Sequence, residues 1–150
     1  MADKQAEDVA YLEACFIFSN LSYAKRLKVG ELIVSPKGII TLGINGTAPG
    51  TPNECEYIDE TTGQLVSHPY VICGAANAIY KAAKQGVSLD GSTLYTTDSP
   101  CPKCTHALIS VGVKRVVYAR QYRMTEHLKL LTDSGISVEQ ISIQYEHLIK

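Results

Sequence analysis

The chain has 150 residues, of which 45% are hydrophobic and 19% charged, a balance typical of one folded domain over residues 1–150 rather than of a disordered segment. Its formal net charge of −1 excludes a strongly basic surface for a nucleic-acid partner, but it allows a local cationic pocket for a small anion. No run approaches the ~20 apolar residues that a membrane span needs, and the acidic N-terminal segment is unlike a signal peptide, so we expect a cytoplasmic protein without a membrane partner.

The first half of the chain predicts a helix followed by a hairpin. Apolar residues between Val9 and Ala24 recur near helical spacing, which predicts an amphipathic helix in the first twenty or so residues. The segments 30–36 and 37–45 are rich in β-branched residues and meet at a Pro-Lys-Gly turn, which predicts a β-hairpin. Residues 46–69 are rich in Gly, Pro, Thr and Asn and are interpreted as one long loop, which is often a binding loop.

Helices and strands alternate in the second half. Helices are predicted over 74–85, 102–111 and 124–135, and strands over 92–98, 114–120 and 136–143. A hairpin followed by β-α-β-α-β units predicts an α/β fold with a mixed sheet flanked by helices. The last ten residues are compatible with a strand or a helix.

Two cysteines stand at the expected start of one helix, in the string Ser99-Pro100-Cys101-Pro102-Lys103-Cys104. Thiols at positions i and i+3 of a first helical turn lie on the same side and can share one metal ion. The helix N-terminus also favours their thiolate form. A thioredoxin-like redox pair and two ordinary buried thiols are the alternatives at this point.

A third cysteine, Cys73, stands at the start of the preceding helix. Two helix N-termini that face each other would bring three thiolates to one Zn²⁺ and leave a fourth position for water, as in catalytic zinc sites. The five cysteines of the chain cannot all form internal disulfides. Cys73, Cys101 and Cys104 are therefore the predicted ligands of one zinc ion, and a small buried residue is the alternative for Cys73.

These motifs resemble the cytidine and deoxycytidylate deaminase superfamily, whose zinc signature is H-x-E followed by P-C-x-x-C. The resemblance covers nearly the whole chain and is strongest to deoxycytidylate (dCMP) deaminases. The supporting motifs are Val29-Gly30, Gly43-Ile44-Asn45-Gly46, Pro69-Tyr70-Val71 and Asn77-Ala78-Ile79. The resemblance implies a three-layer α-β-α fold with a mixed five-stranded sheet, and zinc-dependent deamination of dCMP to dUMP. It also implies a homo-oligomer (a hexamer), regulation by dCTP and dTTP, and Mg²⁺ bound with the triphosphate effector.

Two positions depart from this pattern. Cys73 stands where dCMP deaminases have histidine and is similar to the three-cysteine site of free-nucleoside cytidine deaminases. Ala75 stands at the position of the family's glutamate, which carries protons between water, the ring nitrogen and the leaving ammonia. Alanine cannot do this, so the sequence predicts a chain that binds substrate with little or no turnover, either a natural pseudoenzyme or, as we prefer, an introduced replacement. The acids considered as substitutes are Glu54, Glu56 and Asp98.

The resemblance also suggests nucleotide contacts. Asn45 is predicted to bind the sugar 3′-hydroxyl, with an ordinary turn asparagine as the alternative. The other predicted substrate-binding residues are Arg26, Ser99, Tyr118 and Arg120, and Tyr122 and Arg123 are further phosphate candidates. Gly43, Ile44 and Gly46 are predicted to bind the allosteric nucleotide. A second zinc on Cys15, Cys55 and His68 is considered but not favoured.

Other functions remain open from the sequence. A free-nucleoside cytidine deaminase fits Cys73, and a non-catalytic nucleotide-binding regulator with structural zinc fits Ala75. A deaminase acting on tRNA adenosine is a further alternative, which the near-neutral charge disfavours.

Overall fold

A computed structural model of the chain describes residues 3–122 and 125–150. The helices are α1 (Lys4–Ser19), α2 (Gly74–Gln85), α3 (Pro102–Ser110), α4 (Leu128–Asp133) and the short 3₁₀ helix η1 (Glu146–Leu148). The strands are β1 (Gly30–Val34), β2 (Ile40–Ile44), β3 (Glu56–Ile58), β4 (Leu65–Ser67), β5 (Thr93–Asp98), β6 (Arg115–Arg120) and β7 (Ser137–Gln140).

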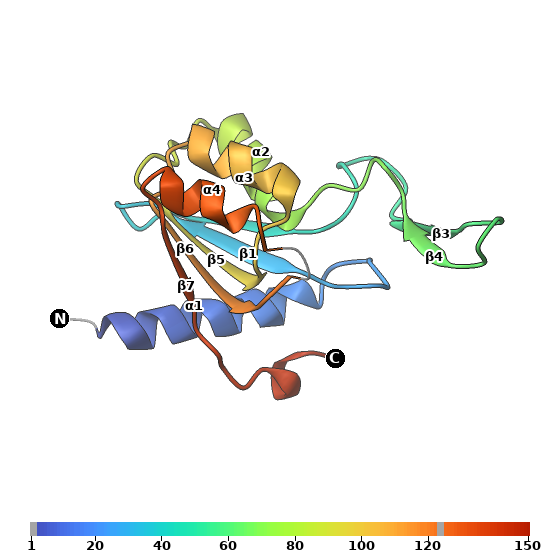
Figure 1. Cartoon of the computed structure of the whole chain (residues 1–150), viewed down its shortest axis with the longest axis horizontal. Helices are drawn as coiled ribbons and strands as arrows, with labels where there is room; N and C mark the ends of the chain where they lie inside the picture. Colours follow the sequence, from blue (N-terminus) through green and yellow to red (C-terminus); the bar gives the residue numbers. More distant parts are fainter. Residues whose placement is uncertain (1–2, 123–124) are drawn as a thin grey trace.

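The main sheet has five strands in the order β2-β1-β5-β6-β7. Strand β1 pairs antiparallel with β2 and β5, and β5, β6 and β7 run parallel. Helix α1 covers one face of this sheet, and α2, α3 and α4 cover the other (Figure 1). The prediction of a three-layer fold with a mixed five-stranded sheet is therefore confirmed.

Some boundaries differ from those predicted. The segment interpreted as one long loop contains the β3–β4 hairpin, which projects from the body of the molecule (Figure 1). Helix α1 ends at Ser19, and Leu21 beyond it is 58% exposed. The helix predicted from apolar residues up to Ala24 was therefore too long. The last ten residues contain η1, and α4 begins at Leu128; residue 124, the expected start of that helix, lies outside the described residues.

Two apolar cores hold the layers together, one between the sheet and α2, α3 and α4 and one between the sheet and α1. A buried polar network also ties α1 to the sheet. The guanidinium of Arg115 donates two hydrogen bonds to the Asp8 carboxylate, at 2.8 and 2.7 Å, and the Tyr95 hydroxyl donates a third at 2.7 Å. Within the described residues, no helix combines the length and hydrophobicity needed to cross a membrane.

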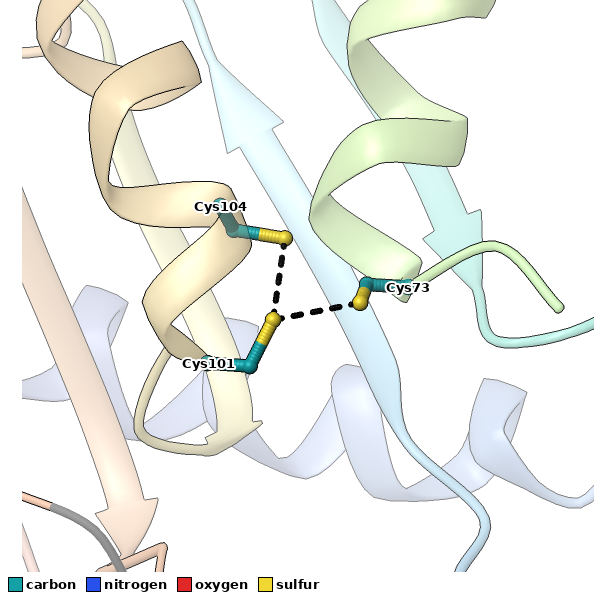
Figure 2. A group of neighbouring side chains, drawn as sticks. All are labelled: Cys73, Cys101 and Cys104. Carbon is teal, nitrogen blue, oxygen red and sulfur yellow. Dashed lines mark hydrogen bonds between the residues drawn. The ribbon is translucent and has the colours of Figure 1, made fainter. Parts of the chain in front are cut away.

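Strand β2 lies unusually close to the start of α2. A Cβ atom on Gly43 would lie 2.0 Å from the Gly74 carbonyl oxygen and 2.8 Å from the Ala78 amide nitrogen. Only glycine fits at position 43, since any side chain would push the strand and the helix apart. This contact sets the N-terminus of α2 directly against the sheet, next to the N-terminus of α3 (Figure 2).

Candidate metal centre and nucleotide cavity

The three predicted ligands meet at the N-termini of two helices. Cys73 is the N-cap residue of α2, Cys101 is the N-cap residue of α3, and Cys104 lies in the first turn of α3. The Cys101 Sγ atom is 3.2 Å from Cys73 Sγ and 3.5 Å from Cys104 Sγ (Figure 2). Among the described residues, these cysteines form the one group of three metal-ligating side chains whose ligand atoms all lie within 4.8 Å of one another.

The donor set fits Zn²⁺. Thiolates are preferred zinc ligands, and helix N-termini stabilise negative charge. Hydrogen bonds between its Sγ atom and those of Cys104 and Cys73, together with the backbone amides of Cys104 and Lys103, lower the pKa of the Cys101 thiol. Three protein ligands leave one coordination position for water or substrate, which is the arrangement of a catalytic rather than a structural zinc site.

A cavity of about 720 Å³ opens onto the three thiols. Its walls come from the segment between α1 and β1, from β1, from the β3–β4 hairpin and its flanks, and from the residues around the N-termini of α2 and α3. Of the predicted substrate-binding residues, Arg26, Asn45 and Ser99 line this cavity, whereas Tyr118 and Arg120 do not.

Asn45 organises the cavity wall through its side chain. Its Oδ1 atom accepts hydrogen bonds from Ser22 Oγ at 2.8 Å and from the Val29 amide at 2.9 Å, and its Nδ2 atom donates to the Leu27 carbonyl at 2.7 Å. These contacts fix the segment that precedes β1. They give Asn45 a structural role beside the predicted contact with the sugar, which stays a prediction.

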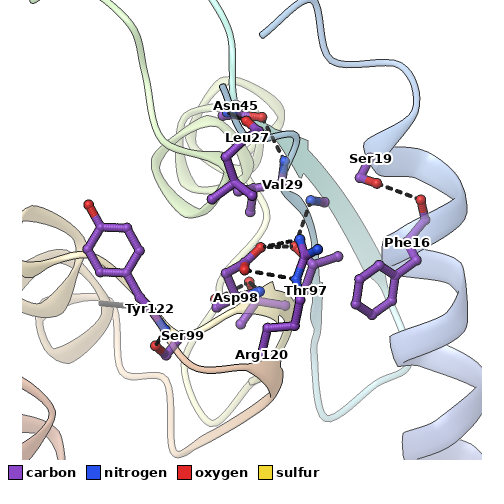
Figure 3. A network of polar contacts seen from close by, with 12 residues as sticks. Phe16, Ser19, Leu27, Val29, Asn45, Thr97, Asp98, Ser99, Arg120 and Tyr122 are labelled. Atoms are coloured by element: carbon purple, nitrogen blue, oxygen red, sulfur yellow. Dashed lines mark hydrogen bonds and ion pairs between the residues drawn. The ribbon is translucent and has the colours of Figure 1, made fainter. Parts of the chain in front are cut away.

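Asp98 and Arg120 form a bidentate ion pair at the ends of β5 and β6. The two nitrogen–oxygen distances are 3.0 and 2.8 Å, and Thr97 Oγ1 also donates to Asp98 (Figure 3). The guanidinium carbon of Arg120 lies 5.1 Å from the centre of the Phe16 ring. Arg120 therefore positions Asp98, which lines the cavity, and its proposed contact with substrate remains a prediction.

The other predicted nucleotide contacts lie in different surroundings. Ser99 Oγ accepts the Tyr122 amide at 2.6 Å (Figure 3), and Arg26 is exposed at the cavity wall. Tyr118 is 8% exposed within β6. Arg123 lies outside the described residues.

The predicted allosteric segment packs against the start of α2. Gly46 exchanges backbone hydrogen bonds with Ile72, and the Ile44 carbonyl accepts from Asn77 Nδ2 at 2.7 Å. The residues considered for a second zinc, Cys15, Cys55 and His68, do not form a metal-ligating group among the described residues. Cys15 Sγ donates to the Tyr95 carbonyl inside a core, while His68 stacks on Tyr70.

One residue of the cavity, Glu31, escaped the sequence analysis. It is an acid in the otherwise apolar strand GELIV, is 4% exposed, and lines the cavity together with the three cysteines. Burial, and next the negative charge of Cys101, raise the pKa of its carboxyl to about 8, while hydrogen bonds from the Thr96 side chain and the Ala75 backbone lower it. A lone acid within an apolar strand was the signal that could have identified it.

Comparisons with known proteins agree with this geometry. The family model described as "Cytidine and deoxycytidylate deaminase zinc-binding region" matches residues 5–120. The crystal structure of dCMP deaminase from the cyanophage S-TIM5, in complex with dCMP and dUMP, superposes with a TM-score of 0.83 at 37% identity, over 94% of this chain and 100% of that one.

Two curated relatives are similar in sequence. The ComE operon protein 2 of Bacillus subtilis is 32% identical over 127 residues, which are 81% of this chain and 64% of the relative. The deoxycytidylate deaminase of Enterobacteria phage T4 is 29% identical over 148 residues, covering 74% of this chain and 76% of the relative. The chain thus spans less than two thirds of the length of the Bacillus protein.

Proposed function

Because the chain belongs to the cytidine and deoxycytidylate deaminase family, we propose that it catalyses the hydrolytic deamination of dCMP to dUMP. The observation that carries this proposal is the cluster of three thiols at the wall of a cavity large enough for a nucleotide. Similarity to the cyanophage dCMP deaminase over 94% of the chain supports the choice of dCMP.

Cys73, Cys101 and Cys104 would hold the zinc ion. When bound, zinc is a Lewis acid that makes water a stronger acid and so provides a nucleophile at neutral pH. The chain itself holds the three ligands in place, since the thiols lie at the starts of two helices.

The 5′-phosphate would be read by cations at the cavity wall. Among the described lining residues, Arg26 and Lys103 carry full positive charges, and both are exposed to solvent. The Arg26 backbone amide is anchored, because it donates to Glu56 Oε2 at 2.8 Å. One charge-assisted hydrogen bond to phosphate contributes roughly 1.5–3 kcal/mol, which is enough for at least tenfold discrimination.

Further properties follow from family resemblance and stay predictions. They are regulation by dCTP and dTTP through the segment containing Gly43, Ile44 and Gly46, Mg²⁺ bound with the triphosphate, and assembly as a hexamer. A free-nucleoside cytidine deaminase remains the second candidate, because Cys73 supplies a third thiol where dCMP deaminases have histidine.

Substrate competition separates the two candidates. We expect kcat/KM for dCMP to exceed that for deoxycytidine at least tenfold, and Arg26→Ala to narrow this gap by weakening dCMP alone. Lys84→Ala, which removes an exposed cation from the last turn of α2, is the matched control. Equal kcat/KM values for the nucleotide and the nucleoside would support the free-nucleoside reaction instead.

The prediction that Ala75 makes the chain inactive depends on whether another carboxylate can carry the protons. The acids named from the sequence do not fill this role well. Glu54 does not line the cavity, Glu56 Oε2 accepts two backbone amides, and Asp98 is paired with Arg120. Glu31, in contrast, lines the cavity and keeps one carboxylate oxygen, Oε2, without a hydrogen-bond partner among the described residues.

A further inference from the structure

Glu31 holds a carboxylate inside the cavity with an oxygen free for chemistry. The residue is 4% exposed, and its Oε2 atom accepts no hydrogen bond from the described residues. A buried carboxylate oxygen without a partner is costly, so natural folds rarely keep one without a function. Glu31 lines the same cavity as Cys73, Cys101 and Cys104.

The side chain of Glu31 reaches the start of α2. A Cβ atom on Gly74 would lie 3.1 Å from Glu31 Cγ and 3.2 Å from its Cδ and Oε1 atoms. The carboxylate therefore lies beside residue 74, one position before Ala75, where zinc deaminases of the H-x-E pattern have their glutamate. Small residues at 74 and 75 leave room for a side chain that enters from β1 instead of from α2.

Neighbouring strands also accommodate this side chain. Glu31 pairs with Gly43 on β2 and with Thr96 on β5. Gly43 has no side chain to compete for the space above the sheet. The Glu31 carboxylate is not among the ligand atoms that lie within 4.8 Å of one another in the thiol cluster, so the three-thiol group is complete without it.

We propose that Glu31 is the catalytic acid and base of this chain, a carboxylate that has moved from the start of α2 to strand β1. This assignment rests on the proposed deamination of dCMP. When water adds to C4 of the pyrimidine, the Glu31 carboxylate takes one proton from the water and delivers it to N3. It then takes the proton of the new C4 hydroxyl and delivers it to the amino group. The C4–N4 bond breaks, the C4 carbonyl forms, and the products are dUMP and ammonia.

The other acids that line the cavity have partners for their carboxylates. Both oxygens of Asp98 are held by Arg120, at 3.0 and 2.8 Å. Glu56 is fixed by the backbone amides of Lys25 and Arg26. Among the carboxylates that line the described cavity, Glu31 is the one that combines near-complete burial with an unpartnered oxygen.

The test compares zinc-loaded wild type with Glu31→Gln, a change that keeps the shape and removes the proton carrier. We expect kcat for dCMP to fall at least ~10²-fold, the low end for general acid–base catalysis, with zinc content and dCMP affinity unchanged. Glu60→Gln, on the exposed turn between β3 and β4, is the matched control and should keep wild-type kcat. The double variant Glu31→Ala/Ala75→Glu returns the carboxylate to α2. Its kcat for dCMP should exceed that of Glu31→Ala by at least tenfold.

A second readout does not need turnover. The deoxynucleotide of pyrimidin-2-one lacks the amino group, and its near-ultraviolet absorbance is lost when water adds across N3 and C4. Wild type should hydrate this analogue, whereas Glu31→Gln should bind it unhydrated. Glu31→Gln with kcat within threefold of wild type would overturn the assignment, as would a loss of zinc or of dCMP binding, which indicates a structural role. A wild-type chain that hydrates the analogue but does not deaminate dCMP would contradict the proposed substrate and leave Glu31 supported.

Discussion

Gly74→Ala provides a stringent test of the contact between α2 and Glu31. The added methyl group would lie 3.1–3.2 Å from three atoms of the Glu31 side chain. Because Glu31 is only 4% exposed, its side chain can relieve this contact only by shifting away from α2 within the cavity that it lines. Overpacking of this kind costs about 1–3 kcal/mol, whereas replacing glycine by alanine in a helix contributes at most ~1 kcal/mol of stability.

The effect of Gly74→Ala on the free energy of unfolding should therefore differ between the wild-type chain and a Glu31→Ala background. In the wild-type chain, Gly74→Ala should destabilise the fold by up to about 2 kcal/mol, which is the overpacking cost less a gain in helix propensity of ~1 kcal/mol. In a Glu31→Ala background the crowding is absent, so the same change should be neutral or stabilising by up to ~1 kcal/mol. The coupling free energy between the two positions should therefore be about 1–3 kcal/mol.

Urea unfolding of the four proteins of this cycle gives the coupling directly. The measurements need one fixed free zinc concentration, because metal binding shifts apparent stability by mass action. The displaced carboxylate should also lower kcat for dCMP by about tenfold in the Gly74→Ala protein, since small misplacements of catalytic groups are expensive. Equal free-energy changes for Gly74→Ala in both backgrounds would refute the contact.

Other predictions address the support of the site. Asp8→Ala should destabilise the protein by about 3–5 kcal/mol in urea unfolding, because it leaves the buried Arg115 guanidinium without its bidentate partner. The hydrogen bonds from Arg115 lower the pKa of Asp8, so the stabilisation from this pair is present above the unfolded-state pKa and is lost as pH falls through the folded-state pKa; Asp8→Ala should show a smaller loss of stability in acid. Cys104→Ser should reduce bound zinc from about one per chain to near zero in metal analysis and lower stability, while Cys15→Ala, within the core against α1, should keep its zinc. A full zinc complement in Cys104→Ser would contradict the ligand assignment.

The fold and the metal centre could be predicted because their signals are local. A hairpin followed by alternating helices and strands determines the mixed sheet, and two helix starts that carry cysteines determine the thiol cluster. The β3–β4 hairpin was missed because each strand has only three residues and partly exposed side chains, too few for an alternating pattern.

The acid at the site could not be predicted from motif spacing. Glu31 and Gly74 are 43 positions apart in sequence, and their contact depends on the packing of α2 against β1 and β2. The acids considered as substitutes from the sequence were Glu54 and Glu56, which precede Ala75 by about twenty positions, and Asp98, which Arg120 neutralises. The placement of Arg120 likewise depended on a partner that only the folded sheet reveals.

The most direct test is the rate of dUMP formation by the zinc-loaded chain as it stands, with Ala75 in place, beside the Ala75→Glu variant. We expect the unaltered chain to release dUMP and ammonia in equal amounts, and Ala75→Glu to be slower because it forces a second carboxylate against the buried Glu31. An unaltered chain that binds zinc and dCMP without turnover, and that gains activity with Ala75→Glu, would contradict the assignment of Glu31 as the catalytic acid and base.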